Sequence, residues 1–428
     1  MEIVALAKYI QAQQPLMVHK DQLYVFSPPC WRGLTEKKAA TYIVEMLAAE
    51  GLDDCITDSD ARAIYRRLLI EPALQHPEEL EQPEGTLNFE DGTYNILESR
   101  FYEHRPEDYF TDYIAVCWDD VVHSPHGETF ELFAAQIGNG DPIVRQQLLE
   151  LTAILLTGME LKYFFVLLGE SNTGKSQFGR FLSELVGRDN VETLRSINDF
   201  KDKWSAGQIS GKKLVTCLDL PDQQLSDDAI GQLKQLVGDD SMKGEKKKGQ
   251  PYTFYRKPLL LCAGNYPIRV PAGEQALLNR MVIIPFSNPC EESQMIHPLY
   301  KELLKESPYI IREAIGAFEN LASNNFQATR AEVPLEYQLQ VYLTPIQVVE
   351  RFVLECCHLE DSQETSSAAL YKAYWAYANE NGFPPLADNV FSRSLSQLAS
   401  RKKWGLTPQK RVTGTDDRGY RGIKLANQ

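Results

Sequence analysis

The sequence has few of the patterns that build metal clusters or disulfide frameworks. Its eight cysteines form no C-x-x-C pair and are scattered through apolar segments. We therefore expect reduced, buried thiols. Cys356, Cys357 and His358 are adjacent, but vicinal cysteines share one tetrahedral ion poorly and no second ligand pair lies at a suitable spacing. The cysteine pattern thus argues against a structural metal site.

Targeting and membrane signals are also missing. The first eight residues contain an early acid and no long apolar core, which argues against a signal peptide. The most apolar region, 151–168, is interrupted by Glu160 and Lys162 and is too broken to span a bilayer. We expect no membrane association and a cytoplasmic location, in a bacterial host.

Positive charge is in deficit: the formal net charge is −15. A surface of that sign does not favour non-specific contact with nucleic acid. A DNA-binding protein of this composition must gather its basic residues locally. The segment 243–257 is one such place, and 391–428 is another, with nine basic and two acidic residues.

The length of 428 residues suggests two or three domains. Residues 1–127 are predicted to form a mostly helical N-terminal domain, with helices at 37–49 and 58–69, a Glu/Pro/Gly-rich linker near 76–86, and a strand and turn at 87–94. Residues 345–428 predict helices at 346–357, 366–379 and 389–400. A hairpin of 402–406 with 419–425 would follow, which is typical of a basic winged-helix-like domain.

The middle of the chain, 128–340, predicts an α/β domain. Helices are expected at 128–160 and 291–340. Continuous apolar runs occur at 163–168, 214–218, 259–263 and 282–286, with helical segments between some of them. Strands that are apolar on both faces and alternate with helices indicate a mainly parallel sheet covered on both sides.

A phosphate loop follows the first apolar run. The segment Gly169-Glu170-Ser171-Asn172-Thr173-Gly174-Lys175-Ser176 matches G-x-x-x-x-G-K-[ST] between a predicted strand and a predicted helix at 177–185. Backbone amides and the helix N-terminus would hold phosphates there. Lys175 would reach the outer phosphates, and Ser176 would ligate Mg²⁺. The motif therefore predicts ATP and Mg²⁺ as cofactors.

Polar residues at later strand ends narrow the prediction. Asp219 ends the second apolar run and is predicted to ligate the metal, while Asp222 follows three residues later and could orient the attacking water. Which of the two activates water stays open. Asn265 ends the third run as a candidate sensor of the terminal phosphate. Arg280 precedes the fourth, where a guanidinium could stabilise the transferring phosphoryl group.

The order of these motifs resembles that of a superfamily 3 helicase. The similarity is to the helicase half of phage and plasmid primase-helicases and of the poxvirus primase-helicase. It extends over roughly 80–428 and includes the stretch Asp91–Thr111. The match is incomplete, since Ser171 and Thr173 replace the usual middle glycine and asparagine, and Asp219 has no acidic neighbour. No primase block precedes the motor, so a separate protein would supply priming.

The resemblance implies an α/β P-loop NTPase (AAA+-like) motor that forms a homo-oligomeric, hexameric ring and moves on single-stranded DNA. Lys175 and Ser176 would belong to Walker A and Asp219 to Walker B. Arg280 would act in the site of a neighbouring subunit. Lys234 and Gly238–Asp240 would lead to a DNA-binding hairpin.

DNA contacts are expected at two basic segments. The hairpin would turn at Lys246-Lys247-Lys248 and return along 252–255, presenting these lysines with Lys243 to single-stranded or forked DNA. Arg401, Lys402 and Lys403 in the C-terminal domain would form a second contact. A solvated loop and a partner-protein surface remain alternatives for these two segments.

The sequence thus favours an ATP-dependent DNA helicase for replication of a phage, plasmid or mobile element. Two other functions stay open. An AAA+ initiator or loader would bind DNA without processive unwinding, and a P-loop assembly switch or defence ATPase would act through protein partners.

Overall fold

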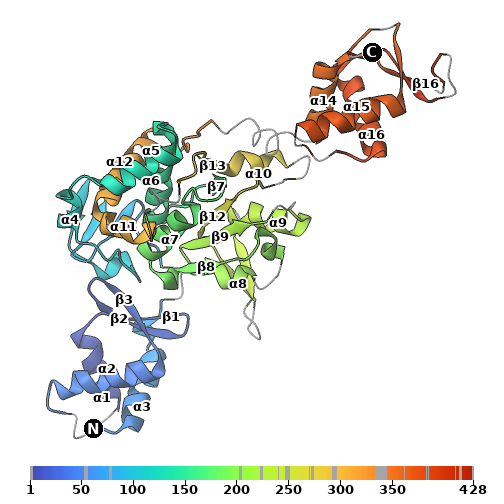
Figure 1. The fold of residues 1–428 in the computed structure, drawn as a ribbon. Helices are drawn as coiled ribbons and strands as arrows, with labels where there is room; N and C mark the ends of the chain where they lie inside the picture. The colour runs from blue at the N-terminus through green and yellow to red at the C-terminus, as the bar shows by residue number, and fades with distance from the viewer. Residues whose placement is uncertain are drawn as a thin grey trace.

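The computed structural model describes residues 3–52, 56–76, 80–201, 205–221, 225–239, 241–245, 251–268, 270, 274–291, 296–332, 345–360, 362–381, 383, 385–409, 411–413 and 417–426. In that part of the chain no helix is both long and apolar enough to cross a membrane. Figure 1 shows an N-terminal unit, a central α/β unit and a C-terminal unit along the chain.

The N-terminal unit is a helix cluster packed on a small antiparallel sheet of order β1-β2-β3. The helices are α1 (Ile3–Gln13), α2 (Glu36–Ala48) and α3 (Asp58–Leu69), and the strands are β1 (Leu16–His19), β2 (Gln22–Ser27) and β3 (Cys30–Leu34). Helices α2 and α3 confirm two predicted helices. The expectation of a mostly helical segment is wrong for 16–34, which forms the sheet.

The missed strands are joined by turns that lack the usual sequence signature. Lys20 and Asp21 form the two-residue β1–β2 loop with φ of 50° and 60°. That backbone is a mirror-image turn, which Asn-Gly or Asp-Gly normally marks. Without those residues, the short strands on either side gave no hairpin signal.

A second antiparallel sheet, β4-β5-β6, follows and packs into the core of the central unit. The strand and turn predicted at 87–94 are confirmed here. The elements are β4 (Thr86–Asn88), β5 (Thr93–Asn95), β6 (Arg100–Tyr102), a 3₁₀ turn at Pro106–Asp108 and α4 (Trp118–Val122). Buried Leu87, Phe89 and Ile114 share this core with α5 (Glu128–Ile137) and α6 (Pro142–Thr157).

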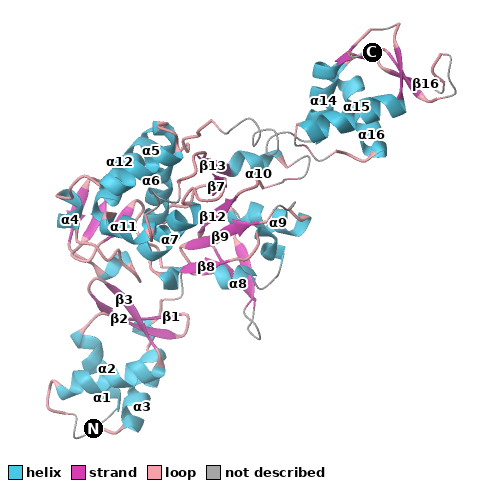
Figure 2. Cartoon of the chain, in the orientation of Figure 1, coloured by secondary structure: helices cyan, strands magenta, loops and turns pink. Residues whose placement is uncertain are grey.

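The central unit contains the predicted parallel sheet, drawn with its flanking helices in Figure 2. Five strands lie in the order β13-β7-β12-β9-β8, all parallel. The strands are β7 (Phe164–Gly169), β8 (Val191–Thr193), β9 (Leu214–Leu220), β12 (Leu259–Gly264) and β13 (Met281–Phe286). The four apolar runs of the sequence are thus four of these strands. Pro285 is tolerated because β13 is an edge strand.

Helices cover both faces of this sheet, and two separate apolar cores form on them. The helices are α7 (Lys175–Leu185), α8 (Ser205–Ile209), α9 (Asp227–Leu236), α10 (Gln275–Arg280), α11 (Leu299–Lys305) and α12 (Ser307–Ser323), with 3₁₀ turns at Arg188–Asn190 and Ile197–Lys201. A hairpin of β10 (Met242–Glu245) and β11 (Pro251–Phe254) precedes β12. The return strand predicted after Lys246–Lys248 is therefore present; those lysines lie outside the described residues.

The C-terminal unit has its own core around Phe352, Tyr374 and Phe391. Its elements are α14 (Pro345–Cys356), β14 (Cys357–His358), β15 (Glu364–Ser366), α15 (Ser367–Glu380), α16 (Asp388–Lys402), β16 (Thr407–Gln409), β17 (Gly419–Arg421) and β18 (Lys424–Leu425). Strand β17 lies between β15 and β16. The three predicted helices are present. The predicted strand at 402–406 is wrong, because α16 ends at Lys402 and the strand that pairs with Gly419–Arg421 is Thr407–Gln409.

Candidate nucleotide site

The phosphate loop is placed by the end of β7 and the start of α7. Gly169 ends the strand, where a Cβ would lie 2.0 Å from the carbonyl oxygen of Phe286 on β13. Gly174 has φ +87° and precedes α7, and no side chain caps that helix. Only glycine tolerates both positions comfortably. The uncapped first turn of α7 therefore presents free amides where an anion would bind.

Lys175 is buried in the loop and is held by oxygen atoms. Its ammonium donates to the carbonyl oxygens of Gly169, at 2.8 Å, and of Glu170, and to the hydroxyl of Thr173 at 3.1 Å. Burial lowers the pKa of Lys175 to about 8. These neutral oxygens compensate the charge incompletely, so an anionic ligand would stabilise the ammonium.

The sheet order brings the other predicted side chains to the same edge. The carboxyl ends of parallel strands form the usual ligand crevice of such sheets. Strand β12 lies between β7 and β9, so Asn265 follows the central one of the three. Its amide donates to the Ser171 hydroxyl at 3.1 Å. Asp219 is exposed near the end of β9, one residue before its last position.

These residues share a cleft of about 840 Å³, a size suited to a nucleotide. Its lining includes 171–177, Asp219 and Asn265. Gly169 and Glu170 contribute through their carbonyl oxygens to Lys175. The position of Ser176 at the start of α7, with Asp219 across the cleft, supplies the oxygen ligands that Mg²⁺ requires. The donor set therefore fits Mg²⁺ with a triphosphate. Asp222 lies outside the described residues.

One wall of the cleft was missed by sequence reasoning. Helix α5 contributes Leu132 and Gln136, and the segment before α11 contributes Ile296. Leu132 is 68% exposed and Ile296 is 45% exposed. Exposed apolar side chains on a cleft wall are suited to a flat, apolar ring. A helix outside the phosphate-loop unit carries no motif that would have signalled this role.

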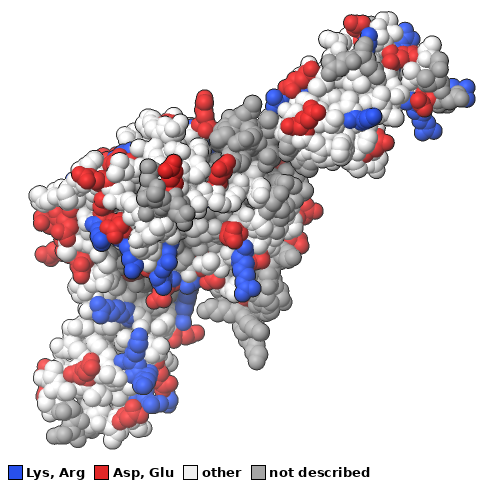
Figure 3. Space-filling view, in the orientation of Figure 1, with Lys and Arg blue, Asp and Glu red and all other residues white. Residues whose placement is uncertain are grey.

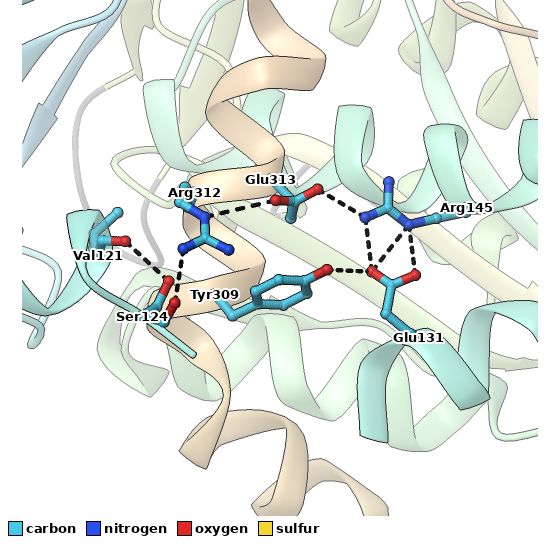
Figure 4. Close-up of polar contacts among 7 residues, drawn as sticks. All are labelled: Val121, Ser124, Glu131, Arg145, Tyr309, Arg312 and Glu313. Carbon is cyan, nitrogen blue, oxygen red and sulfur yellow. Dashed lines mark hydrogen bonds and ion pairs between the residues drawn. The ribbon is translucent and has the colours of Figure 1, made fainter. Parts of the chain in front are cut away.

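Polar contacts anchor α5 to α6 and α12, as Figure 4 shows. Glu131 on α5 accepts from the Arg145 guanidinium at 2.7–3.0 Å and from the Tyr309 hydroxyl at 2.7 Å. Arg145 also pairs with Glu313 on α12. Despite desolvation, the bonds from Arg145 and Tyr309 lower the pKa of Glu131. At the other end, Glu306 accepts from the Thr129 and Phe130 amides at 2.9 and 2.8 Å. The cleft wall is thus held rigidly.

Arg280 is not in this cleft. It ends α10, and its guanidinium donates to the carbonyl oxygen of Lys234 at 3.4 Å. Met281, the next residue, pairs with Phe164 at the start of β7, whereas the phosphate loop begins at the other end of that strand. Five strand residues at ~3.3 Å each separate Arg280 from the loop by roughly 17 Å. The structure therefore does not bring Arg280 to the cleft of its own chain.

The amino edge of the sheet has a charged hollow of about 190 Å³ instead. Lys257, which follows β11, has a side chain only 6% exposed and donates to the Gly238 carbonyl, with Glu160 at 3.8 Å. Lys162 pairs with Asp239 at 2.6 Å, and that bond lowers the pKa of Asp239. The predicted Gly238-Asp239 segment therefore contacts the base of the hairpin; Asp240 lies outside the described residues.

The predicted DNA contacts are dispersed. Lys243 is exposed on β10. Lys402 pairs with Glu350 of α14 at 2.8 Å, and Lys403 caps the end of α16 with φ 56°. The side chain of Arg401 is outside the described residues. Lys402 is therefore partly neutralised within its own unit.

The strand order, loop and convergent edge define a P-loop-like α/β fold. Three family models match the chain: "D5 N terminal like" over 5–137, "Family of unknown function (DUF5906)" over 167–280 and "Poxvirus D5 protein-like" over 347–420. The two D5 models thus show that the N-terminal and C-terminal parts of the chain are similar to those of D5-like primase-helicases.

Solved structures support the fold over the full length. The A form apo structure of the NrS-1 C-terminal region is 10% identical, with a TM-score of 0.51, and the alignment covers 99% of this chain and 100% of that one. A second apo structure of that region (305–718) is 9% identical, with a TM-score of 0.51 and 99% coverage of both chains. At this identity the likeness shows the fold.

Proposed function

We propose that the protein is an ATP-dependent DNA helicase of replication that works as a hexameric ring on single-stranded and forked DNA. The observation that carries the proposal is the convergence of Lys175, Asp219 and Asn265 in one nucleotide-sized cleft. Similarity to D5-like primase-helicases at both ends of the chain supports an enzyme that acts on nucleic acid.

In this proposal, each residue of the cleft has a distinct task. Lys175 and the first-turn amides of α7 hold the outer phosphates. Ser176 and Asp219 would hold Mg²⁺, which neutralises charge on the phosphate oxygens. Asn265, fixed by Ser171, orients the terminal phosphate or the attacking water. Leu132 and Ile296 flank the base.

Arg280 supports the ring. Because Arg280 starts at the edge of the sheet opposite its own phosphate loop, its guanidinium would act on a nucleotide across a subunit boundary. It would then stabilise charge on the phosphoryl group bound by the neighbour. The contact of Arg280 with the Lys234 carbonyl keeps the guanidinium at the amino edge until a neighbour docks.

The C-terminal unit supports a second DNA contact. The order α14, β15, α15, α16, β16, β17, with β17 between β15 and β16, is that expected for a winged helix. Domains of this type place the second helix of a helix-turn-helix in the major groove. Here that helix would be α16, which carries Arg393 and ends at Lys402.

Subunit mixing tests the shared site. Lys175→Ala should abolish hydrolysis by removing the phosphate contact, and Arg280→Ala by removing the contact with the neighbour's nucleotide. Mixed rings contain some interfaces with both residues intact, so ATPase activity should partly recover. No recovery on mixing would remove the shared-site mechanism.

Unwinding of a forked duplex tests the helicase. ATP-dependent strand separation is expected from the wild-type chain and not from Lys175→Ala. Binding to DNA and ATP without strand separation would favour the initiator or loader. ATPase activity indifferent to DNA would favour the assembly switch. Failure of the purified protein to retain Mg·ATP would exclude all three.

A further inference from the structure

The N-terminal unit carries basic side chains that the nucleotide site does not use. Arg32 on β3 and Lys37 and Lys38 in the first turn of α2 are exposed. They line a groove of about 590 Å³ between the sheet and α2. Glu45 is the acidic residue in this lining. The groove is therefore locally basic in a chain of net charge −15.

The pairing of charges sets these three cations apart from their neighbours. On α3, Arg62 pairs with Asp58, Arg66 with Glu36 and Arg67 with Glu71. Within the described part of the chain, no carboxylate forms an ion pair with Arg32, Lys37 or Lys38. The unit thus neutralises the cations of one helix and leaves those of the groove available to an external anion.

An aromatic ring and a hydroxyl group also line the groove. Tyr42 is half-buried there, and its hydroxyl donates to Gln14 at 2.8 Å, which fixes the ring in place. Ser27 adds a hydroxyl to the lining. Cations beside a fixed aromatic ring match the backbone and bases of a single strand. A purely acidic peptide would use the cations and leave the ring without a role.

The groove is fixed against the central unit. The Trp31 amide donates to the Phe110 carbonyl at 2.7 Å, and its indole donates to the Pro106 carbonyl at 2.8 Å. Burial raises the pKa of the neighbouring Cys30 thiol, which Arg32 and, in the central unit, Lys213 both lower. Arg32 and Lys213 therefore act on the same thiol from two units.

The charge distribution continues across this junction. Figure 3 shows basic side chains gathered over the N-terminal unit and the adjoining edge of the central unit, whereas acidic side chains predominate around α4. Lys213 immediately precedes β9 at the amino edge of the sheet, where its ammonium pairs with Asp112 at 2.8 Å.

We propose that the groove between β3 and α2 binds the phosphate backbone of single-stranded DNA through Arg32, Lys37 and Lys38. The inference rests on the proposed action on DNA and adds a contact outside the nucleotide unit and the hairpin. The groove would hold the strand where it enters or leaves the ring.

The test is the salt dependence of binding to labelled oligo(dT) by the full chain. Each phosphate contact to a single strand contributes about 0.7 to the slope of log K against log salt. The variant Arg32→Gln/Lys37→Gln/Lys38→Gln should therefore lose about two units of slope. The control, Lys8→Gln/Lys20→Asn/Lys301→Gln, removes equal charge from exposed sites elsewhere and should keep the wild-type slope. Asparagine is used at position 20 because φ there is 50°.

The possible outcomes test the groove proposal separately from the proposed helicase function. An unchanged slope in the groove variant, or an equal loss in the control, would overturn the proposal while leaving the helicase intact. A wild-type chain that binds no oligo(dT) would instead remove the proposed function. The melting temperature and DNA-independent ATPase should match wild type; if the triple variant misfolds, Lys37→Gln/Lys38→Gln should lose about two thirds as much slope. Equal displacement of oligo(dT) by poly-glutamate of the same charge would overturn the preference for nucleic acid.

Discussion

The two edges of the central sheet differ in how their polar side chains are used. At the carboxyl edge, Lys175 and Asn265 bond to atoms of the phosphate loop and face an open cleft. At the amino edge, Lys257 and Asp239 bond to charged or carbonyl groups around a small hollow. The first edge is organised for a ligand and the second for internal contacts.

The difference indicates that the two edges of the sheet could have separate roles. A nucleotide at the carboxyl edge would contact residues of its own subunit, while Arg280 and the hairpin base lie at the other edge. Lys234 and Gly238, near the end of α9, contact Arg280 and Lys257 respectively. The end of α9 is therefore placed to link the arginine with the hairpin.

The largest expected effect is on the rate of ATP hydrolysis, and its absence would contradict the separate roles of the two sheet edges. Arg280→Ala should lower kcat for ATP about 10³-fold, because a lost arginine finger costs at least that much. The nucleotide Kd should stay near wild type, since Arg280 is absent from its own cleft. Arg280→Lys should not restore kcat, because an ammonium lacks the planar fork. A raised Kd with normal kcat would place Arg280 in its own site.

Asn265→Ala should have the next largest effect. Loss of a positioned donor should lower kcat by roughly 100-fold and leave the KM for ATP nearly unchanged. Steady-state kinetics measure both. Ser171→Ala, which removes the partner of the amide, should have a smaller effect in the same direction. Equal kcat in wild type and Asn265→Ala would assign the sensing role elsewhere.

Lys257→Met tests the amino edge as a structural element. Removing the buried ammonium takes away the donor to the Gly238 carbonyl and the cation beside Glu160, which keeps its bond from the Lys257 backbone amide. It should lower the free energy of unfolding by about 1–2 kcal/mol. Thermal denaturation measures this, and the exposed Lys162–Asp239 pair supplies the control, since Lys162→Met should cost clearly less. Equal losses would show that burial is not what distinguishes Lys257.

The smallest expected effect is a proton taken up on nucleotide binding. Without ligand, the pKa of Lys175 is about 8, so the group is mostly neutral at pH 9. Phosphates would raise that pKa, so binding at pH 9 should take up nearly one proton, and at pH 6.5 almost none. Calorimetry in buffers of different ionisation enthalpy measures the uptake. Persistence of the uptake in Lys175→Met would assign it to another group.

The lowered pKa of Lys175 also predicts how the stability of the ligand-free protein changes with pH. The folded pKa of Lys175 lies below its ordinary value of 10.5, so the charged form is disfavoured in the fold. The free-energy cost of holding the charged Lys175 in the fold is fully present below pH 8. This cost is relieved as the pH rises from about 8 toward 10.5. The ligand-free protein should gain a little stability from this group across that window.

The sequence by itself determined four of the five strands of the central sheet and the phosphate loop. Continuous apolar runs leave few alternatives to a doubly covered sheet, and the glycines at 169 and 174 occupy positions that a side chain would block. Local patterns also located α2, α3 and the three C-terminal helices. They failed at 16–34, where Lys20-Asp21 makes a turn without glycine, and at 402–406, where α16 ends at Lys402 and the strand β16 begins only at Thr407.

Only the tertiary structure decided which side chains meet. Strand order is a long-range property, and no local pattern shows that β12 lies between β7 and β9, which is why Asn265 meets Ser171. The wall formed by Leu132 and Ile296 and the separation of Arg280 from the cleft follow from packing between segments distant in sequence. Residue spacing along a chain reports local geometry, whereas distance across a sheet depends on which strands pair.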